Sequence, residues 1–192
     1  MAIPFNIDQL KARLATGGAR NNLFSVQISA PAIVGLPANA TFLINAAKLP
    51  EVDMGVIEVP FMGRKLRVPG DRTFPAWSVS VINDEDFTIR QAMEKWTNLI
   101  NGLSTNLRDS NFASLASLKC DATVTQYSKT GADLRTYKFA GMFPQSISAI
   151  DLDWNQNDQI EYFNVTFVYD YWTVTPAGTA TTNAGVVQQV LQ

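Results

Sequence analysis

The chain has 192 residues, with 15 Lys and Arg against 17 Asp and Glu. It contains no His and a single cysteine, Cys120, which excludes His-based triads, imidazole metal sites, disulfides within the chain and Cys-type zinc sites. No motif predicts catalysis, so we expect a protein that is not an enzyme and needs no cofactor. No apolar run approaches the ~18 residues of a membrane span, and no stable membrane insertion is expected.

Charge is distributed unevenly along the chain. Residues 1–138 hold 15 basic and 12 acidic residues, net +3, whereas residues 139–192 hold five acidic and no basic residues, net −5. Only 17% of residues are charged, below the ~25% of an average domain. This asymmetry favours self-assembly, because patches of opposite charge meet across a repeated interface.

The N-terminal third begins with an expected amphipathic helix over residues 6–15, where Ile7, Leu10 and Leu14 recur at helical spacing. Alternation over Leu23–Ser29 predicts a strand, and Thr41–Ala46 reads as a second one.

Residues 48–75, which we call the arm, combine strand-like pieces with seven Gly and Pro residues. This combination predicts a long, projecting, bent hairpin. Its many apolar side chains leave two alternatives open: the arm folds back onto its own core, or it docks on a neighbouring molecule.

A strand with Trp77, Val79 and Val81 on one face follows the arm. We then expect a helix over residues 84–101, with Asp84 as N-cap, and a loop over residues 103–117.

The C-terminal half predicts strands over Leu118–Tyr127, Leu134–Ala140, Gln145–Asp153 and Ile160–Val174. In the last of these, alternate residues from Phe163 to Tyr171 would face the core. The four Trp residues are interpreted as packing residues. Residues 175–192 carry no charge and are expected to form a flexible tail.

Together these elements predict a mainly β fold. We expect a single domain over residues 1–174, in which two packed antiparallel sheets form a sandwich or barrel with one flanking α-helix and the projecting arm.

The acidic run Asp151-x-Asp153-x-Asn155-x-Asn157 resembles the start of a calcium-binding loop. It lacks the required Gly, since Gln156 stands there, and a polar turn explains it better.

Several segments carry a family resemblance. They are Val59–Phe74 (VPFMGRKLRVPGDRTF), its continuation Trp77–Glu85 (WSVSVINDE), Asn22-Leu23-Phe24, Leu152-Asp153-Trp154 and Asp170-Tyr171-Trp172. In this order, over about residues 20–173, the chain resembles the tail tube proteins of T-even and related contractile-tailed bacteriophages. It departs from them in the residues that follow Trp172 and around residues 104–117.

The resemblance implies a structural virion protein. Its hexameric rings would stack into a hollow tube inside a contractile sheath, penetrate the bacterial envelope and conduct viral DNA without sequence-specific binding. Implied partners besides the chain itself are the sheath protein, the baseplate tube-initiator, the tape-measure protein and the tail-terminator. The protein would be assembled in the host cytoplasm. The inner tube of a genome-free injection particle and a monomeric ligand-binding β-barrel are the alternatives.

Two groups of residues are candidate sites within such a tube. The expected inter-ring interface consists of arm residues: Val56, Phe61, Met62, Arg64, Lys65, Arg67, Arg72 and Phe74. The candidate lumen wall consists of carboxylates that would repel DNA phosphates: Asp151, Asp153, Asp158 and Glu161.

Overall fold

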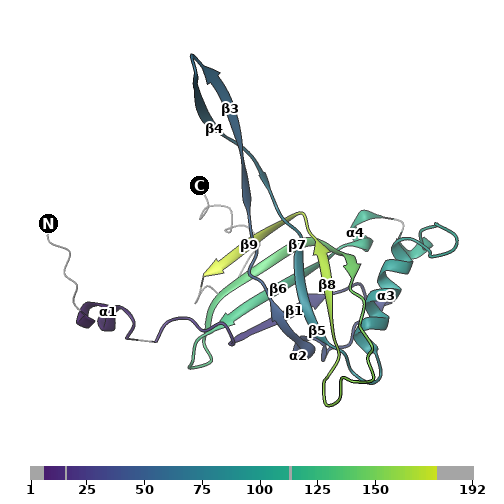
Figure 1. The fold of residues 1–192 in the computed structure, drawn as a ribbon. Coiled ribbons are helices and arrows are strands. Elements are labelled where there is room, and N and C mark those ends of the chain that lie inside the picture. The colour runs from purple at the N-terminus through teal and green to yellow at the C-terminus, as the bar shows by residue number, and fades with distance from the viewer. Residues whose placement is uncertain (1–6, 16, 113, 177–192) are drawn as a thin grey trace.

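The computed structural model describes residues 7–15, 17–112 and 114–176, which form a mainly β body with a two-stranded arm projecting from one end (Figure 1). The helices and 3-10 turns are α1 (Ile7–Arg13), η1 (Ala32–Val34), α2 (Ala40–Leu43), α3 (Thr88–Ile100), η2 (Ser110–Phe112) and α4 (Leu115–Leu118). The strands are β1 (Phe24–Ser29), β2 (Ile44–Ala47), β3 (Asp53–Phe61), β4 (Arg64–Thr73), β5 (Trp77–Ile82), β6 (Cys120–Tyr127), β7 (Asp133–Ile147), β8 (Tyr162–Val168) and β9 (Tyr171–Pro176). None of the described helices is long and apolar enough to cross a bilayer.

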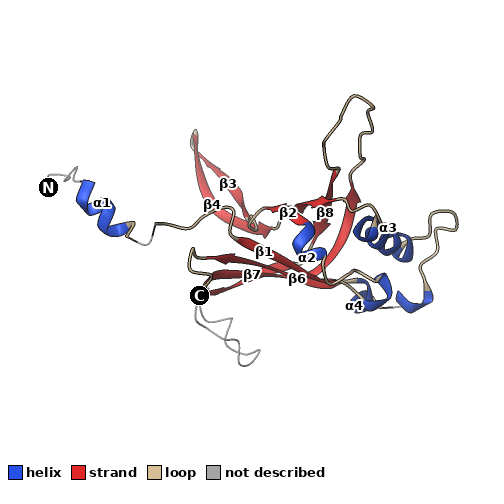
Figure 2. Cartoon of the chain, turned by 90° about the horizontal axis from the view of Figure 1, so that it is seen from below, coloured by secondary structure: helices blue, strands red, loops and turns tan. Residues whose placement is uncertain are grey.

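The body is one antiparallel sheet folded into two layers. Its strands follow the order β1-β6-β7-β8-β5-β2, and β9 also pairs with β7. The first half of β7 lies between β6 and β9, and its second half pairs with β8. Figure 2 shows the two layers from below. The long strand β7 therefore belongs to both layers and joins them.

A glycine marks the place where β7 passes between the layers. Gly141 has a φ of +67°, and a Cβ at this position would overlap the carboxylate of Asp170. Only glycine adopts this conformation without strain, so Gly141 allows β7 to bend beside the junction of β8 and β9.

The core lies between the two layers. Trp77 of β5 stacks on Phe139 of β7 with ring centroids 4.4 Å apart, and Phe167 of β8 lies 5.9 Å from the same indole. All three side chains are at most 3% exposed. The alternating pattern of β5 places Trp77, Val79 and Val81 inward, as the sequence predicts.

Helix α3 flanks the sheet and contributes its apolar face to the core. Trp96 is fully buried, lies 6.4 Å from the Phe167 ring, and donates from Nε1 to the carbonyl of Leu118 at 3.1 Å. The helix begins at Thr88 rather than at residue 84, because Phe87 takes a left-handed conformation (φ 53°). Asp84 lies outside the helix, but its carboxylate still accepts the Thr88 N–H at 2.9 Å.

Other boundaries also differ from the expectations. The segment expected as one strand from Thr41 forms the helical turn α2 before β2 begins at Ile44. The two strands expected at 134–140 and 145–153 form a single β7 that ends at Ile147. The single strand expected at 160–174 is two strands, interrupted at Tyr169 and Asp170 and ending at Pro176. Residues 177–192 of the expected tail lie outside the described residues.

The break between β8 and β9 changes which side chains face the core. Phe163, Val165 and Phe167 are buried as expected, but Tyr171 is 52% exposed and its neighbour Trp172 packs on the core instead. The interruption shifts the alternation by one residue, which exchanges the two faces of the strand. The fold class itself is confirmed: the protein is mainly β with two antiparallel layers, a flanking helix and a projecting hairpin.

Candidate assembly interface

The arm is a regular antiparallel hairpin. Strands β3 and β4 pair from Asp53 opposite Thr73 to Phe61 opposite Arg64. The two residues at the tip, Met62 and Gly63, have φ values of 43° and 81°, as a type I′ turn requires at both central positions. The sequence places Gly where this turn needs it.

Two glycines bring the arm strands close together near the body. The register shifts between Met54 and Val56, where Gly55 faces Gly70. A Cβ on Gly70 would lie 3.1 Å from the Gly55 backbone, which is tighter than ordinary contact. The glycines thus permit a close backbone approach where the two strands twist across each other (Figure 1).

The arm exposes apolar side chains along its whole length. Phe61 is 67% exposed and Met62 is 91% exposed. The same holds for Val52, Met54, Val56, Ile57, Val59, Leu66 and Val68, which are all exposed. The alternative in which the arm folds back onto its own core is therefore not what the structure shows. Contiguous exposed apolar surface of this kind marks an interaction site.

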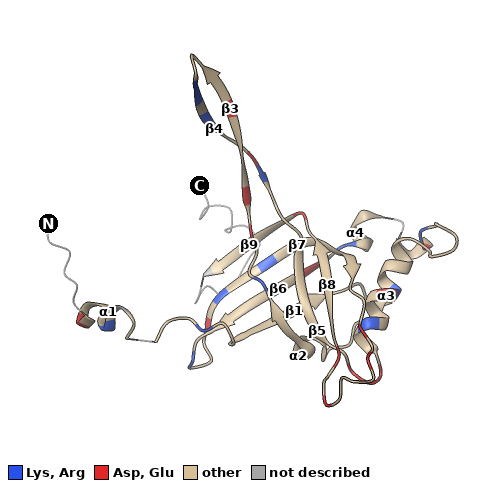
Figure 3. Ribbon diagram, viewed as in Figure 1, with Lys and Arg blue, Asp and Glu red and all other residues tan. Residues whose placement is uncertain are grey.

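Basic side chains gather on the outer part of the arm, on β4 (Figure 3). Glu58 pairs with Lys65 at 2.5 Å and with Arg67 at 3.6 Å, and these pairs are largely exposed. Within the described residues, Arg64 and Arg72 make no ion pair. Exposed pairs stabilise a fold little, so these charges are free to engage a partner.

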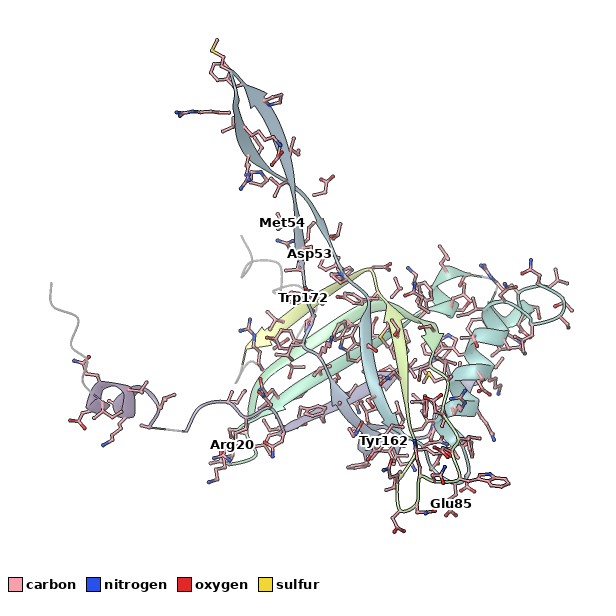
Figure 4. All side chains as sticks on the ribbon, viewed as in Figure 1. Arg20, Asp53, Met54, Glu85, Tyr162 and Trp172 are labelled. Atoms are coloured by element: carbon pink, nitrogen blue, oxygen red, sulfur yellow. The ribbon has the colours of Figure 1, made fainter. Side chains whose placement is uncertain are left out.

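The base of the arm is held by hydrogen bonds from two indoles. Trp77 donates from Nε1 to the Lys48 carbonyl at 2.7 Å, and Trp172 donates to the Glu51 carbonyl at 3.4 Å. Both bonds involve the segment that leads into β3. The base is therefore fixed on the body, whereas the strands beyond it are free of body contacts in Figure 4.

Phe74 differs from the other seven residues predicted for the inter-ring interface. It is half-buried and packs against Tyr169 of the same chain, with ring centroids 6.0 Å apart. The Tyr169 hydroxyl is buried and has no hydrogen-bond partner among the described residues. Its burial and, second, the nearby Glu51 carboxylate raise its pKa above the usual value. Phe74 thus anchors the arm, and the remaining seven residues lie exposed on it.

The predicted lumen-wall residues lie at the opposite end of the molecule, on the loop between β7 and β8. Asp151, Asp153 and Asp158 are exposed, and Glu161 is half-buried and accepts from Asn83 Nδ2 at 2.8 Å. Figure 3 shows the acidic residues of this loop beside those of the β5–α3 connection.

The same loop exposes apolar residues that the sequence analysis missed. Trp154 is 99% exposed, Leu152 is 80% exposed and Ile160 is 63% exposed. The expectation that Trp154 packs in the core is wrong, because β7 ends at Ile147 and the loop carries Trp154 away from the sheets. In the sequence, Trp154 lies between Asp153 and Asn155, and this polar context already indicated an exposed position.

The described part of the chain contains few side chains arranged to bind a metal ion or to act as a nucleophile. No group of three or more His, Cys, Asp or Glu there could hold a metal ion. Burial, and second the Asp121 carboxylate, raise the pKa of Cys120 to about 12, so its thiol is protonated and unreactive near neutral pH. The arm and the β7–β8 loop are therefore the features that stand out on the surface.

Comparison with known proteins decides the family. A family model described as phage tail tube protein matches residues 19–175. The chain belongs to the phage tail tube protein family. It is 36% identical to "Tail tube protein gp19" of Enterobacteria phage T4 over 155 residues, 80% of this chain and 90% of that protein. It is also 26% identical to the tail tube protein of Serratia phage KSP90 over 174 residues, 85% of this chain and 93% of that protein.

Solved structures support the same fold for this tail tube protein. A chain in the cryo-EM structure of the anti-feeding prophage tube-terminating cap aligns with a TM-score of 0.60 and 19% identity, covering 83% of this chain and 92% of that chain. A chain in the sheath/tube terminator of an extracellular contractile injection system aligns with a TM-score of 0.58 and 17% identity, covering 82% and 96%. The resemblance recognised from the sequence is confirmed.

Proposed function

We propose that this tail tube protein forms hexameric rings that stack into a hollow tube inside a contractile sheath. The tube penetrates the bacterial envelope and conducts viral DNA. The observation that carries the proposal is the arm: a fixed base, an extended hairpin and an apolar surface left exposed along its whole length. Burying that surface against another copy supplies the free energy of assembly.

The position of the arm supports the proposal that rings stack. A contact between different surfaces of identical subunits closes into a ring when the rotation closes, and continues as a filament when it does not. The arm projects from one end of the body (Figure 1), so it reaches beyond the subunit toward the next ring. Val56, Phe61, Met62 and the basic residues Arg64, Lys65, Arg67 and Arg72 would form the inter-ring contact.

The sheath, the baseplate and the terminator are named with the fold relatives, whereas the tape-measure protein is proposed from the family resemblance alone. A sheath protein, a baseplate initiator, a tape-measure protein and a terminator would engage the tube in a virion assembled in the host cytoplasm. The relatives above 30% identity are phage proteins, which supports a phage tail over a genome-free particle.

The lumen wall remains a prediction. Carboxylates at Asp151, Asp153, Asp158 and Glu161 would repel phosphates and let DNA pass, whereas Lys and Arg contacts would hold it. Their place on a loop at one end of the subunit would put them at the rim of each ring.

Negative-stain microscopy of the purified chain tests the proposal. The wild-type chain should form tubes, with or without a baseplate seed. The charge reversal R64E/R67E should remain folded and form none, while the control R108E/K129E, which changes the net charge equally outside the arm, should form normal tubes. Tubes of normal length from R64E/R67E would contradict the role of the arm.

A further inference from the structure

The β7–β8 loop presents an apolar surface at the end of the body opposite the arm. The loop spans 14 residues (148–161) and exposes three large apolar side chains, Leu152, Trp154 and Ile160. None of the three packs on the body core, so they do not contribute to its stability. Fully exposed Trp is costly in water. This surface is suited to be covered by a partner.

Hydrogen bonds hold this loop in shape. Asp153 accepts the backbone N–H and the side-chain amide of Asn155 at 2.9 and 3.0 Å, and the Ser148 N–H donates to the Asn164 carbonyl at 2.8 Å. The loop surrounds an open hollow of about 560 Å³, lined by Leu152, Trp154, Ile160 and neighbouring residues of the loop. The hollow therefore combines the exposed apolar side chains with polar and acidic ones from the same loop.

The charges around the hollow are complementary to those of the arm. Residues 148–162 carry four acidic and no basic residues, and the adjoining β5–α3 connection adds Asp84, Glu85 and Asp86. Residues 54–72 of the arm carry four basic and two acidic residues. In the described part of the chain, Arg64 and Arg72 of the arm make no ion pair. Asp151 and Asp158 of the loop make none either.

The two surfaces face opposite ways on one subunit. Figure 4 places Met54 on the part of the arm next to the body, and Tyr162 and Glu85 at the side of the body away from the arm. The nine residues of β3 extend over roughly 30 Å at ~3.3 Å per residue, so the tip reaches well past the body. Within one molecule the arm and the loop lie at opposite ends (Figure 1), whereas copies stacked in the same direction would bring the arm of one toward the loop of the next.

We propose that the arm of one copy docks on the β7–β8 loop of a copy in the adjacent ring. The apolar arm residues cover Leu152, Trp154 and Ile160, and Arg64 and Arg72 pair with the carboxylates at the rim of the hollow. The inference rests on the proposed function and adds the receiving surface. It gives the acidic loop a role in stacking, in contrast to the predicted role at the lumen.

Cysteine cross-linking tests this contact directly. The native Cys120 is buried and does not compete for a maleimide. Tubes assembled from a mixture of E58C and Q156C chains, treated with a short bismaleimide, should yield covalent dimers, because Glu58 lies on the arm and Gln156 lines the hollow while neither belongs to the proposed apolar contact. A matched mixture of E58C and L103C should yield none, because Leu103 is 94% exposed but lies on another loop. Dimers in the control mixture alone would overturn the inference.

A charge exchange provides a second, independent measurement. R64E/R72E and D151K/D158K should each lose tube formation, and one chain that carries all four changes should regain it. Tubes from D151K/D158K alone, or tubes of the E58C and Q156C mixture that do not cross-link, would overturn the docking inference and leave the proposed function intact. Absence of tubes from the wild-type chain would instead overturn the proposed function.

Discussion

Strands β5 and β3 are both rich in valine, yet they have opposite surroundings. In β5 every second side chain is buried, whereas β3 is exposed at all nine positions. The body buries its apolar residues between two layers, and the arm presents them to solvent. The same residue types thus stabilise the fold in one region and are available for assembly in the other.

The difference follows from the number of strands that each region contains. The body closes seven strands and a helix around one core, but an isolated two-stranded ribbon has no second layer to pack on. The arm therefore contributes little to the stability of the subunit. Mutations should separate the two regions into one that controls folding and one that controls assembly.

The largest effect is expected at the centre of the body. Phe167 is completely buried between Trp77 and Trp96. Phe167→Ala should lower the free energy of unfolding by about 3–5 kcal/mol, because it leaves a cavity as well as losing burial. Urea denaturation followed by tryptophan fluorescence measures this loss, and a change below 1 kcal/mol, on the scale of ordinary surface substitutions, would contradict the assigned core.

A smaller loss is expected at the bend of β7. Gly141→Ala places a Cβ against Asp170, which pairs with Lys119 at 2.7 Å, and it also strains the left-handed backbone. We expect a loss of roughly 2–3 kcal/mol. The control Gly131→Ala has a similar φ with open space around it and should cost only about 1 kcal/mol. Equal losses in the two variants would argue against the clash.

Alkaline pH should weaken the body through Cys120. The unfolded thiol loses its proton near pH 9.0, whereas the folded body keeps it up to about 12. Between these values the unfolded state binds fewer protons, so the free energy of unfolding falls by ~1.4 kcal/mol per pH unit from this group. Denaturation of wild-type and Cys120→Ala proteins from pH 8 to 11 isolates the effect, and parallel curves would contradict it.

The smallest effect on folding is expected in the arm. Phe61 is 67% exposed, so Phe61→Ala should change the free energy of unfolding by less than about 0.5 kcal/mol. The same variant should lose tube formation, because the removed ring is part of the proposed contact. Denaturation and electron microscopy on one preparation measure both quantities. A large loss of stability with intact tubes would contradict the assignment of the arm to assembly rather than folding.

Sequence reasoning predicted features that local chemistry determines. Alternation predicted the inward face of β5, and the density of Gly and Pro predicted a projecting hairpin over residues 48–75. The sequence left open whether the apolar residues of this hairpin fold back onto the core, and the structure shows them exposed. Local patterns suffice in these segments because each is regular over its whole length.

Other features depend on contacts that are distant in sequence. The continuity of β7 through Gly141 depends on its pairing with β6, β8 and β9, and no local pattern contains it. At the interruption between β8 and β9, Asp170 pairs with Lys119, which is 51 residues away in the sequence. The exposure of Trp154 depends on where β7 ends. These features were therefore missed or misplaced by the sequence analysis.

Removal of the arm tests the central claim most directly. Asp53 and Thr73 pair across the hairpin, so an Asn-Gly turn in place of residues 54–72 closes the chain without moving the body. The shortened protein should keep the thermal unfolding midpoint of the wild type and form no tubes. Loss of cooperative unfolding, or tubes from the armless chain, would contradict the division between a body that folds and an arm that assembles.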